Sequence, residues 1–84
     1  MEEKEIGEVT HYFNKIGVAI VSLSDTLRVG DTIHIRGVHD DFTQEVTSMQ
    51  IEHQNVQEAN KGDLVGIKVS SRVHPKDKVY KVIS

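Results

Sequence analysis

Apolar and polar side chains alternate along much of this chain with a period of two residues. In residues 32–36, for example, Ile33 and Ile35 alternate with His34 and Arg36. This period places successive side chains on opposite faces of a β-strand, whereas an amphipathic helix needs a period of 3.6. We therefore predict strands throughout the chain. Ile33 and Ile35 are expected in the core, and His34 and Arg36 are expected to face solvent.

Turn signals divide this pattern into six predicted strands. Two Gly-Asp pairs, Gly30-Asp31 and Gly62-Asp63, mark turns, and so does the stretch His74-Pro75-Lys76-Asp77. The predicted strands cover roughly residues 4–13, 16–24, 32–36, 42–53, 65–70 and 78–83.

The predicted strand over residues 42–53 requires an irregularity. Val46 and Met49 are both apolar but lie three positions apart, so a regular strand cannot turn both towards the core. A β-bulge near Thr47-Ser48 removes this conflict and would curve the strand.

A chain of 84 residues has room for one domain, which we take to span residues 1–84. Six short strands without a long amphipathic helix favour an all-β fold that closes into a small barrel, because closure removes exposed strand edges. An open sandwich is the alternative.

Composition excludes several classes of function. The net charge of −3 gives no overall attraction to nucleic acid or anionic membranes, so an RNA contact would need a local basic patch. The absence of cysteine excludes disulfides, thiol catalysis and thiolate metal sites. The N-terminus is acidic and the longest apolar run is too short to cross a bilayer. We therefore expect a cytoplasmic protein without a membrane partner.

No catalytic or cofactor motif is present in the sequence. The chain lacks both the phosphate-binding loop and the glycine-rich dinucleotide motif, so we expect neither nucleotide nor any other cofactor. Its serines do not lie in the strand-turn-helix motif of hydrolases. We predict a protein that is not an enzyme and has no catalytic residues.

Histidines are the one unusual enrichment, but their spacing matches no zinc motif. We interpret them as solvated or half-buried strand residues without a metal. The segment His39-Asp40-Asp41 is interpreted as a polar loop tip. The five histidines are His11, His34, His39, His53 and His74.

The candidate residues for binding RNA or another partner are basic side chains predicted on strands or at strand ends. Small β-barrels often bind nucleic acid through such surfaces, usually together with aromatic stacking platforms. Phe13 and Phe42 are instead predicted to lie in the core. The candidate residues are His34, Arg36, Lys68 and Arg72.

Three segments resemble the barrel domain that follows the GTPase domain in elongation factor Tu and its relatives. They agree with that domain in order and spacing, and the resemblance extends from about Gly7 to Val82. A further stretch, residues 7–19, looks closer to the C-terminal barrel of collagenase-like bacterial peptidases. The three segments are residues 27–35, 46–50 and 56–67.

The resemblance implies a six-stranded antiparallel Greek-key barrel. In elongation factors this barrel contacts the aminoacyl end of tRNA and the small ribosomal subunit. The GTPase domain of those factors is absent here, and Lys76-Asp77 replaces a Gly-Asp turn of the family.

Two functional hypotheses remain open. The first is a non-catalytic, stand-alone translation-factor-like barrel that binds RNA, such as tRNA or ribosomal RNA, or a ribonucleoprotein. The second is a protein-interaction module that acts in trans with a peptidase or an RNA-modifying enzyme.

Overall fold

The computed structural model describes residues 2–83, which form ten strands and contain no helix. Within this range there is accordingly no helical segment with the length and apolar character needed to span a membrane. The strands are β1 (Glu3–Phe13), β2 (Val18–Leu23), β3 (Leu27–Arg28), β4 (Thr32–Arg36), β5 (Asp41–Glu45), β6 (Met49–Ile51), β7 (Gln54–Val56), β8 (Glu58–Ala59), β9 (Leu64–Lys68) and β10 (Lys78–Val82).

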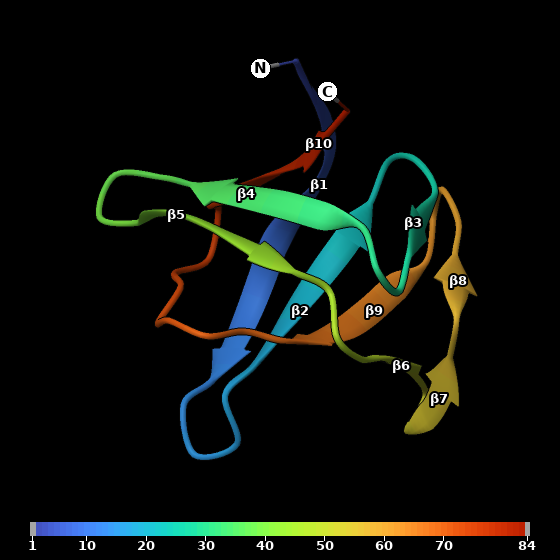
Figure 1. Cartoon of the computed structure of the whole chain (residues 1–84). Helices are drawn as coiled ribbons and strands as arrows, with labels where there is room; N and C mark the ends of the chain where they lie inside the picture. The colour runs from blue at the N-terminus through green and yellow to red at the C-terminus, as the bar shows by residue number, and fades with distance from the viewer. Residues whose placement is uncertain (1, 84) are drawn as a thin grey trace.

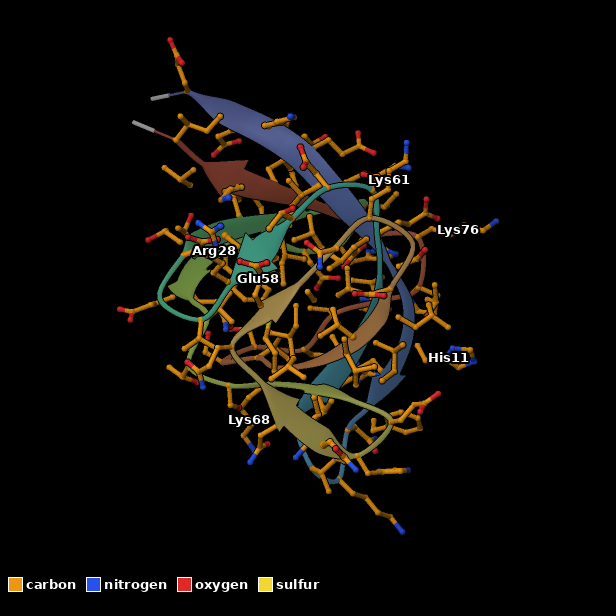
Figure 2. The ribbon with its side chains drawn as sticks, turned by 90° about the vertical axis from the view of Figure 1, so that its right-hand side faces the viewer. His11, Arg28, Glu58, Lys61, Lys68 and Lys76 are labelled. Carbon is orange, nitrogen blue, oxygen red and sulfur yellow. The ribbon has the colours of Figure 1, made fainter. Side chains whose placement is uncertain are left out.

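Eight strands form one antiparallel sheet in the order β5-β4-β10-β1-β2-β9-β6-β7 (Figure 1). The remaining two, β3 and β8, pair with each other in a small second sheet. An ion pair of 2.6 Å between Arg28 and Glu58 links these two strands on the surface (Figure 2). The all-β, antiparallel class predicted from the sequence is therefore confirmed.

The strand ladder differs from the predicted six-stranded closed barrel, because its order is open and ends at β5 and β7. A side chain nevertheless joins β5 to the segment that leaves β9. The Gln44 amide nitrogen donates to the Lys68 carbonyl at 2.8 Å, and the Gln44 amide oxygen accepts from the Ser70 N–H at 2.7 Å. The sheet thus curls far enough for Gln44 in β5 to hydrogen-bond both the last residue of β9 and Ser70 beyond it.

The core consists of inward-facing residues of the curled sheet together with residues of the small sheet and of connecting segments, namely Leu27, Ala59, Val46, Val69 and Val73. In β4, Ile33 and Ile35 are fully buried, as the alternation predicts. The predicted bulge near residues 47–48 appears as an interruption, because β5 ends at Glu45 and β6 begins at Met49. This break allows Val46 and Met49 both to be buried although they lie three positions apart.

Three turns share one construction, in which an aspartate side chain accepts the backbone N–H three residues before it. Asp31 accepts from Arg28 at 2.9 Å, Asp63 from Asn60 at 2.8 Å, and Asp77 from His74 at 3.0 Å. The residue before each aspartate has positive φ, as expected at the third position of a type II turn. These three residues are Gly30, Gly62 and Lys76, with φ values of 100°, 92° and 78°.

The beginning of β1 and the end of β10 lie side by side (Figure 1). Glu3 is paired with Val82, and the N–H of Ile83 donates to the carbonyl of Glu2 at 2.8 Å. The two ends of the described chain are therefore held together by the central ladder.

Candidate functional site

An apolar groove of about 670 Å³ lies on the outer face of the curled sheet. In β2, Ala19 and Val21 are buried in the core, so the residues that alternate with them point outwards. Outward side chains from β1, β2, β6 and β9 and from the β1–β2 turn come together at this position. The apolar residues of the groove are Phe13, Ile16, Val18, Ile20, Ile51 and Leu64.

Gly66 gives the groove its depth. It lies in the middle of β9, paired with Ile20 on one side and Gln50 on the other. A Cβ atom at this position would lie 3.3 Å from a methyl group of Val18. A glycine inside a strand often marks such a place where a side chain would obstruct an approach. Gly66 thus leaves a depression between the outward side chains of its neighbours.

Three large apolar side chains of the groove are exposed to solvent. Phe13, Ile16 and Leu64 are 48%, 58% and 59% exposed, and the ring of His11 stacks beside Phe13 with centroids 6.5 Å apart. The prediction that Phe13 belongs to the core is wrong, because it ends β1 at the tip of the first hairpin, away from the core. Phe42, in contrast, packs against the core. Clustered exposed apolar residues of this kind typically mark an interaction surface.

A two-residue hairpin turn forms one rim of the groove. Ile51 pairs with Gln54, and the residues between them, Glu52 and His53, have φ of 50° and 66°. A turn of this type is usually built from asparagine or glycine, because other residues pay a conformational cost at positive φ. The hairpin holds Glu52 and His53 at the edge of the groove.

The structure encloses His34, one of the predicted binding residues, between two carboxylates. Its side chain points away from the core as predicted, but its Nδ1 lies 2.8 Å from Glu3 and its Nε2 hydrogen-bonds Asp41. An ionised carboxylate can only accept, so the imidazole donates to both groups only in its charged form. The hydrogen bond to Asp41, assisted by Glu3, raises the pKa of His34 despite partial burial, which lowers it. In that form the charge of His34 is paired with Glu3 and Asp41 within the protein.

The other three predicted residues lie on separate elements. Arg36 is in β4 and Lys68 is in β9. Three strands separate them along the ladder, and β5 lies between them on the other side, where its Gln44 bonds the Lys68 carbonyl. The Lys68 ammonium donates to the carbonyl of Ile16 at 2.7 Å, which ties it to the first hairpin. Arg36 and Arg72 are exposed, and neither forms an ion pair with another residue in the range 2–83.

The three lysines of the neighbouring strands β1 and β10 are each ion-paired with carboxylates; they are Lys4, Lys78 and Lys81. In Figure 2, Lys68 lies on the lower part of the molecule, far from Lys61 and Lys76. A single-stranded nucleic acid is usually bound along a continuous positive groove. The apolar groove is consequently the more distinct surface feature of this protein.

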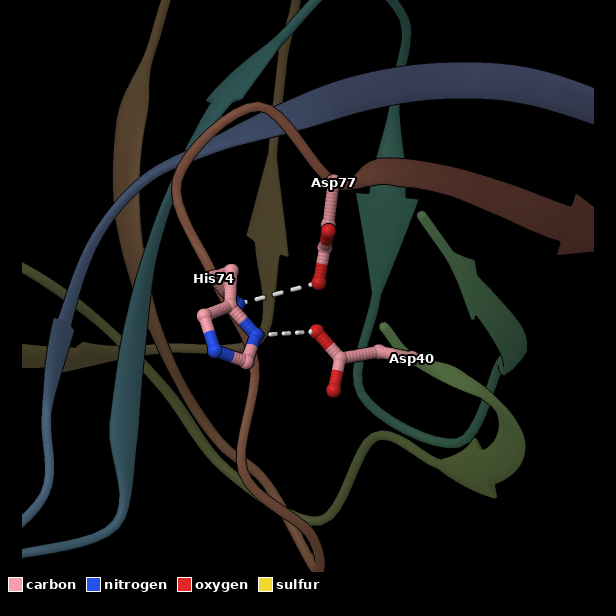
Figure 3. A group of neighbouring side chains, drawn as sticks. All are labelled: Asp40, His74 and Asp77. Carbon is pink, nitrogen blue, oxygen red and sulfur yellow. Dashed lines mark hydrogen bonds and ion pairs between the residues drawn. The ribbon is translucent and has the colours of Figure 1, made fainter. Parts of the chain in front are cut away.

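A second cluster of polar groups joins the β4–β5 loop to the turn before β10 (Figure 3). His74 Nδ1 lies 2.6 Å from a carboxylate oxygen of Asp40, and the backbone N–H of His74 donates to Asp77. Ligand atoms from Asp40, His74 and Asp77 all lie within 4.8 Å of one another. The ring of His39 is next to that of His74, with centroids 5.3 Å apart.

The two carboxyl groups of this cluster affect each other's ionisation. Burial raises the pKa of Asp77, and the hydrogen bond with Asp40 raises it further. For Asp40, burial opposes ionisation, but hydrogen bonds from Asp77 and His74 outweigh it and leave the pKa lowered. Sequence reasoning missed this cluster, because Asp40 and His74 are 34 positions apart and only the folded chain brings them together.

Residues 18–71, more than half of the chain, match the family model of elongation factor Tu domain 2. The chain is 43% identical over 77 residues to an uncharacterized protease of Methanocaldococcus jannaschii, and 36% identical over 78 residues to a collagenase of Porphyromonas gingivalis. Each match covers 90% of this chain but only 19% and 22% of the relatives. The chain therefore spans about a fifth of their length.

A solved structure has the same fold. The C-terminal domain of a Geobacillus thermoleovorans protein assigned as a U32 peptidase superposes with a TM-score of 0.89. The superposition covers 95% of this chain and 93% of that domain, at 24% identity. At this level of identity the likeness concerns the fold alone.

Proposed function

Since the chain belongs to the elongation factor Tu domain 2 family, we propose that it is a non-catalytic β-domain that binds a protein partner through its apolar groove. The observation that carries the proposal is the group of exposed apolar side chains, Phe13, Ile16 and Leu64, around the depression at Gly66. Aromatic and aliphatic anchors that fit into such depressions supply most of the energy of protein interfaces.

The partner that we propose is an enzyme domain of the peptidase family to which the chain is similar. The matched relatives carry their equivalent of this chain together with about four fifths of additional protein. A β-domain that packs on the rest of an enzyme does so through an exposed surface, and a hydrophobic one favours a fixed arrangement. The groove offers that surface, whether the enzyme is on the same polypeptide or on another one in the cytoplasm.

Affinity purification after nuclease treatment, with mass spectrometry of the bound proteins, tests this function. We expect a protein of the peptidase family to be retained by the wild-type chain and to be lost with the Phe13→Asp, Leu64→Asp double variant. Val38→Asp is the matched control, because Val38 is 92% exposed but lies outside the groove. Equal retention by the groove variant and the control would show that the groove is not the binding surface.

RNA binding is the second candidate function, and the exposed guanidinium groups of Arg36 and Arg72 favour it. The ligand would be tRNA or ribosomal RNA, as the likeness to a translation-factor domain suggests. Fluorescence anisotropy with labelled tRNA and a ribosomal RNA hairpin, at low and physiological salt, tests it. Binding that weakens with salt and is reduced in the Arg36→Ala, Lys68→Ala pair would support this function. Unchanged binding by that pair would exclude the predicted patch.

We also infer that the sheet acts as a closed six-stranded Greek-key barrel of the translation-factor type. The Gln44 side chain supports this inference, because it forms two hydrogen bonds where strand pairing is missing, one to Lys68 at the end of β9 and one to Ser70 beyond it. A closed barrel would present the groove on a rigid surface, which suits a docking function.

A further inference from the structure

We propose that His39, Asp40, His74 and Asp77 form a binding site for a divalent transition-metal ion, with Zn²⁺ as the best match. This site lies apart from the groove and is independent of the function proposed above. The two pairs of residues come from different segments, the β4–β5 loop and the turn before β10. A bound ion would therefore cross-link the two segments.

The placement of the ligand atoms carries the proposal. Those of Asp40, His74 and Asp77 lie within 4.8 Å of one another, whereas ligands of a tetrahedral Zn²⁺ ion, bound at about 2.0–2.1 Å, lie roughly 3.4 Å apart. Binding of one ion would draw these three ligand atoms closer together. His39 lies outside this group of three, but its exposed ring is beside that of His74, with centroids 5.3 Å apart, and in the proposal it turns towards the ion as the fourth donor.

Burial and charge distinguish this cluster from ordinary surface acids. Asp77 is only 3% exposed and is the one residue with a polar or charged side chain in the buried class of the described chain. Its carboxyl faces that of Asp40, whose side chain is 9% exposed, and no lysine or arginine within residues 2–83 forms an ion pair with either. His74, which lies 2.6 Å from Asp40, is the one basic side chain paired with these carboxyl groups in the described chain. Two adjacent carboxyl groups, one buried and one half-buried, avoid mutual repulsion by sharing a proton or by binding a cation, and the proposed ion takes the second route.

The turn and its surroundings hold the aspartates in place. The backbone N–H of His74 donates to Asp77, and a Cβ atom at Gly37 would lie 2.6 Å from the Asp77 Cγ atom. Gly37 therefore allows this carboxyl group to pack against the β4–β5 loop. Such support around the ligands is what orients a metal site before the ion arrives.

The donor set selects the ion. Two imidazole nitrogens and two carboxylate oxygens suit Zn²⁺ and neighbouring transition metals, whereas Mg²⁺ and Ca²⁺ prefer oxygen ligands alone. Four protein ligands are typical of a structural zinc site rather than a catalytic one. The expected role is to fasten the β4–β5 loop to the last turn.

The test is a titration of the tag-free, chelator-treated full chain with Zn²⁺ by calorimetry, and with Co²⁺ by visible absorption spectroscopy. We expect one ion per chain, the intense absorption of tetrahedral Co²⁺, and a higher melting temperature with Zn²⁺. His39→Ala, a change in an exposed loop, should weaken binding at least tenfold without unfolding the protein. Asp40→Asn should weaken it further.

His53→Ala and His34→Gln are the matched controls. The first removes an exposed histidine outside the cluster, and the second removes a histidine that contacts two carboxylates elsewhere. Both should keep the wild-type affinity. The site is refuted by absence of stoichiometric binding, by an octahedral Co²⁺ spectrum, or by loss of affinity in either control that equals the loss in His39→Ala.

Discussion

Lys76 adopts the left-handed backbone conformation that Gly62 adopts in the equivalent turn, with φ of 78° and 92°. Glycine takes this conformation without steric cost, whereas a residue with a Cβ atom pays roughly 1–2 kcal/mol. Both turns are closed by an aspartate, Asp77 and Asp63, that accepts a backbone N–H. The turn before β10 thus has a lysine at the position of positive φ, where a glycine would avoid the steric cost.

Replacing Lys76 by glycine should stabilise the protein. We expect Lys76→Gly to raise the free energy of unfolding by about 0.5–1 kcal/mol, because relief of the left-handed conformation exceeds the entropy that glycine adds to the unfolded chain. Gly62→Ala is the reciprocal control. It should destabilise by about 1 kcal/mol, and open space around Gly62 makes that cost purely conformational. Urea denaturation measures both, and a less stable Lys76→Gly variant would contradict the account.

Removing the Gln44 side chain should weaken the contact between β5 and the segment at the end of β9. Gln44→Ala deletes the hydrogen bonds to Lys68 and Ser70, which corresponds to a loss of about 1–2 kcal/mol. The amide of Ser70 should then exchange faster with solvent in hydrogen-exchange NMR. Gln57→Ala, at an exposed glutamine, is expected to change neither quantity. Unaltered protection of the Ser70 amide would mean that interactions other than those of Gln44 hold β5 against the end of β9.

His34 should make stability depend on pH near neutrality. Its hydrogen bonds to Asp41 and Glu3 raise its pKa, so this contribution is complete below the unfolded pKa of about 6.5 and disappears as pH rises through the folded pKa. We expect a higher urea midpoint at about pH 6 than at about pH 8.5. His34→Gln should reduce this difference, and an identical pH profile in the variant would assign the effect to other groups.

Core and groove isoleucines should respond differently to truncation. Ile35 is fully buried, so Ile35→Ala should cost about 2–5 kcal/mol of stability. Ile16 lies in the groove and is 58% exposed, and Ile16→Ala should remain within about 0.5 kcal/mol of the wild type. Thermal unfolding compares the two. A large loss for Ile16→Ala would identify the groove as part of the folding core instead of a binding surface.

Local patterns predicted the strands well where one face is buried. The alternation in residues 32–36 placed Ile33 and Ile35 correctly, and the spacing of Val46 and Met49 located the interruption between β5 and β6. Both inferences depend only on neighbours along the chain. The pattern did not reveal the short pairing of β3 with β8, which depends on residues about 30 positions apart.

Most of the candidate sites could not be predicted from the sequence, because each combines residues from distant segments. His34 was predicted to face outwards, but its partner Glu3 is 31 positions away. Phe13 has a large apolar side chain of the kind found in cores, and its exposure is explained by its place at the end of a hairpin strand. A spacing rule for metal ligands likewise missed Asp40 and His74, which fold together from two separate loops.

The pairing of Glu3 with Val82 gives the unit a single point of attachment. A polypeptide that enters through β1 leaves through β10 a few ångströms away, so this domain can be spliced into a surface loop of a larger protein without separating the two halves of that loop. The same proximity makes the chain suitable for circular permutation, with a short linker that joins the present ends and a new opening at an exposed turn. In mechanical terms, force applied at the two ends would load the hydrogen bonds between β1 and β10 first, one pair at a time.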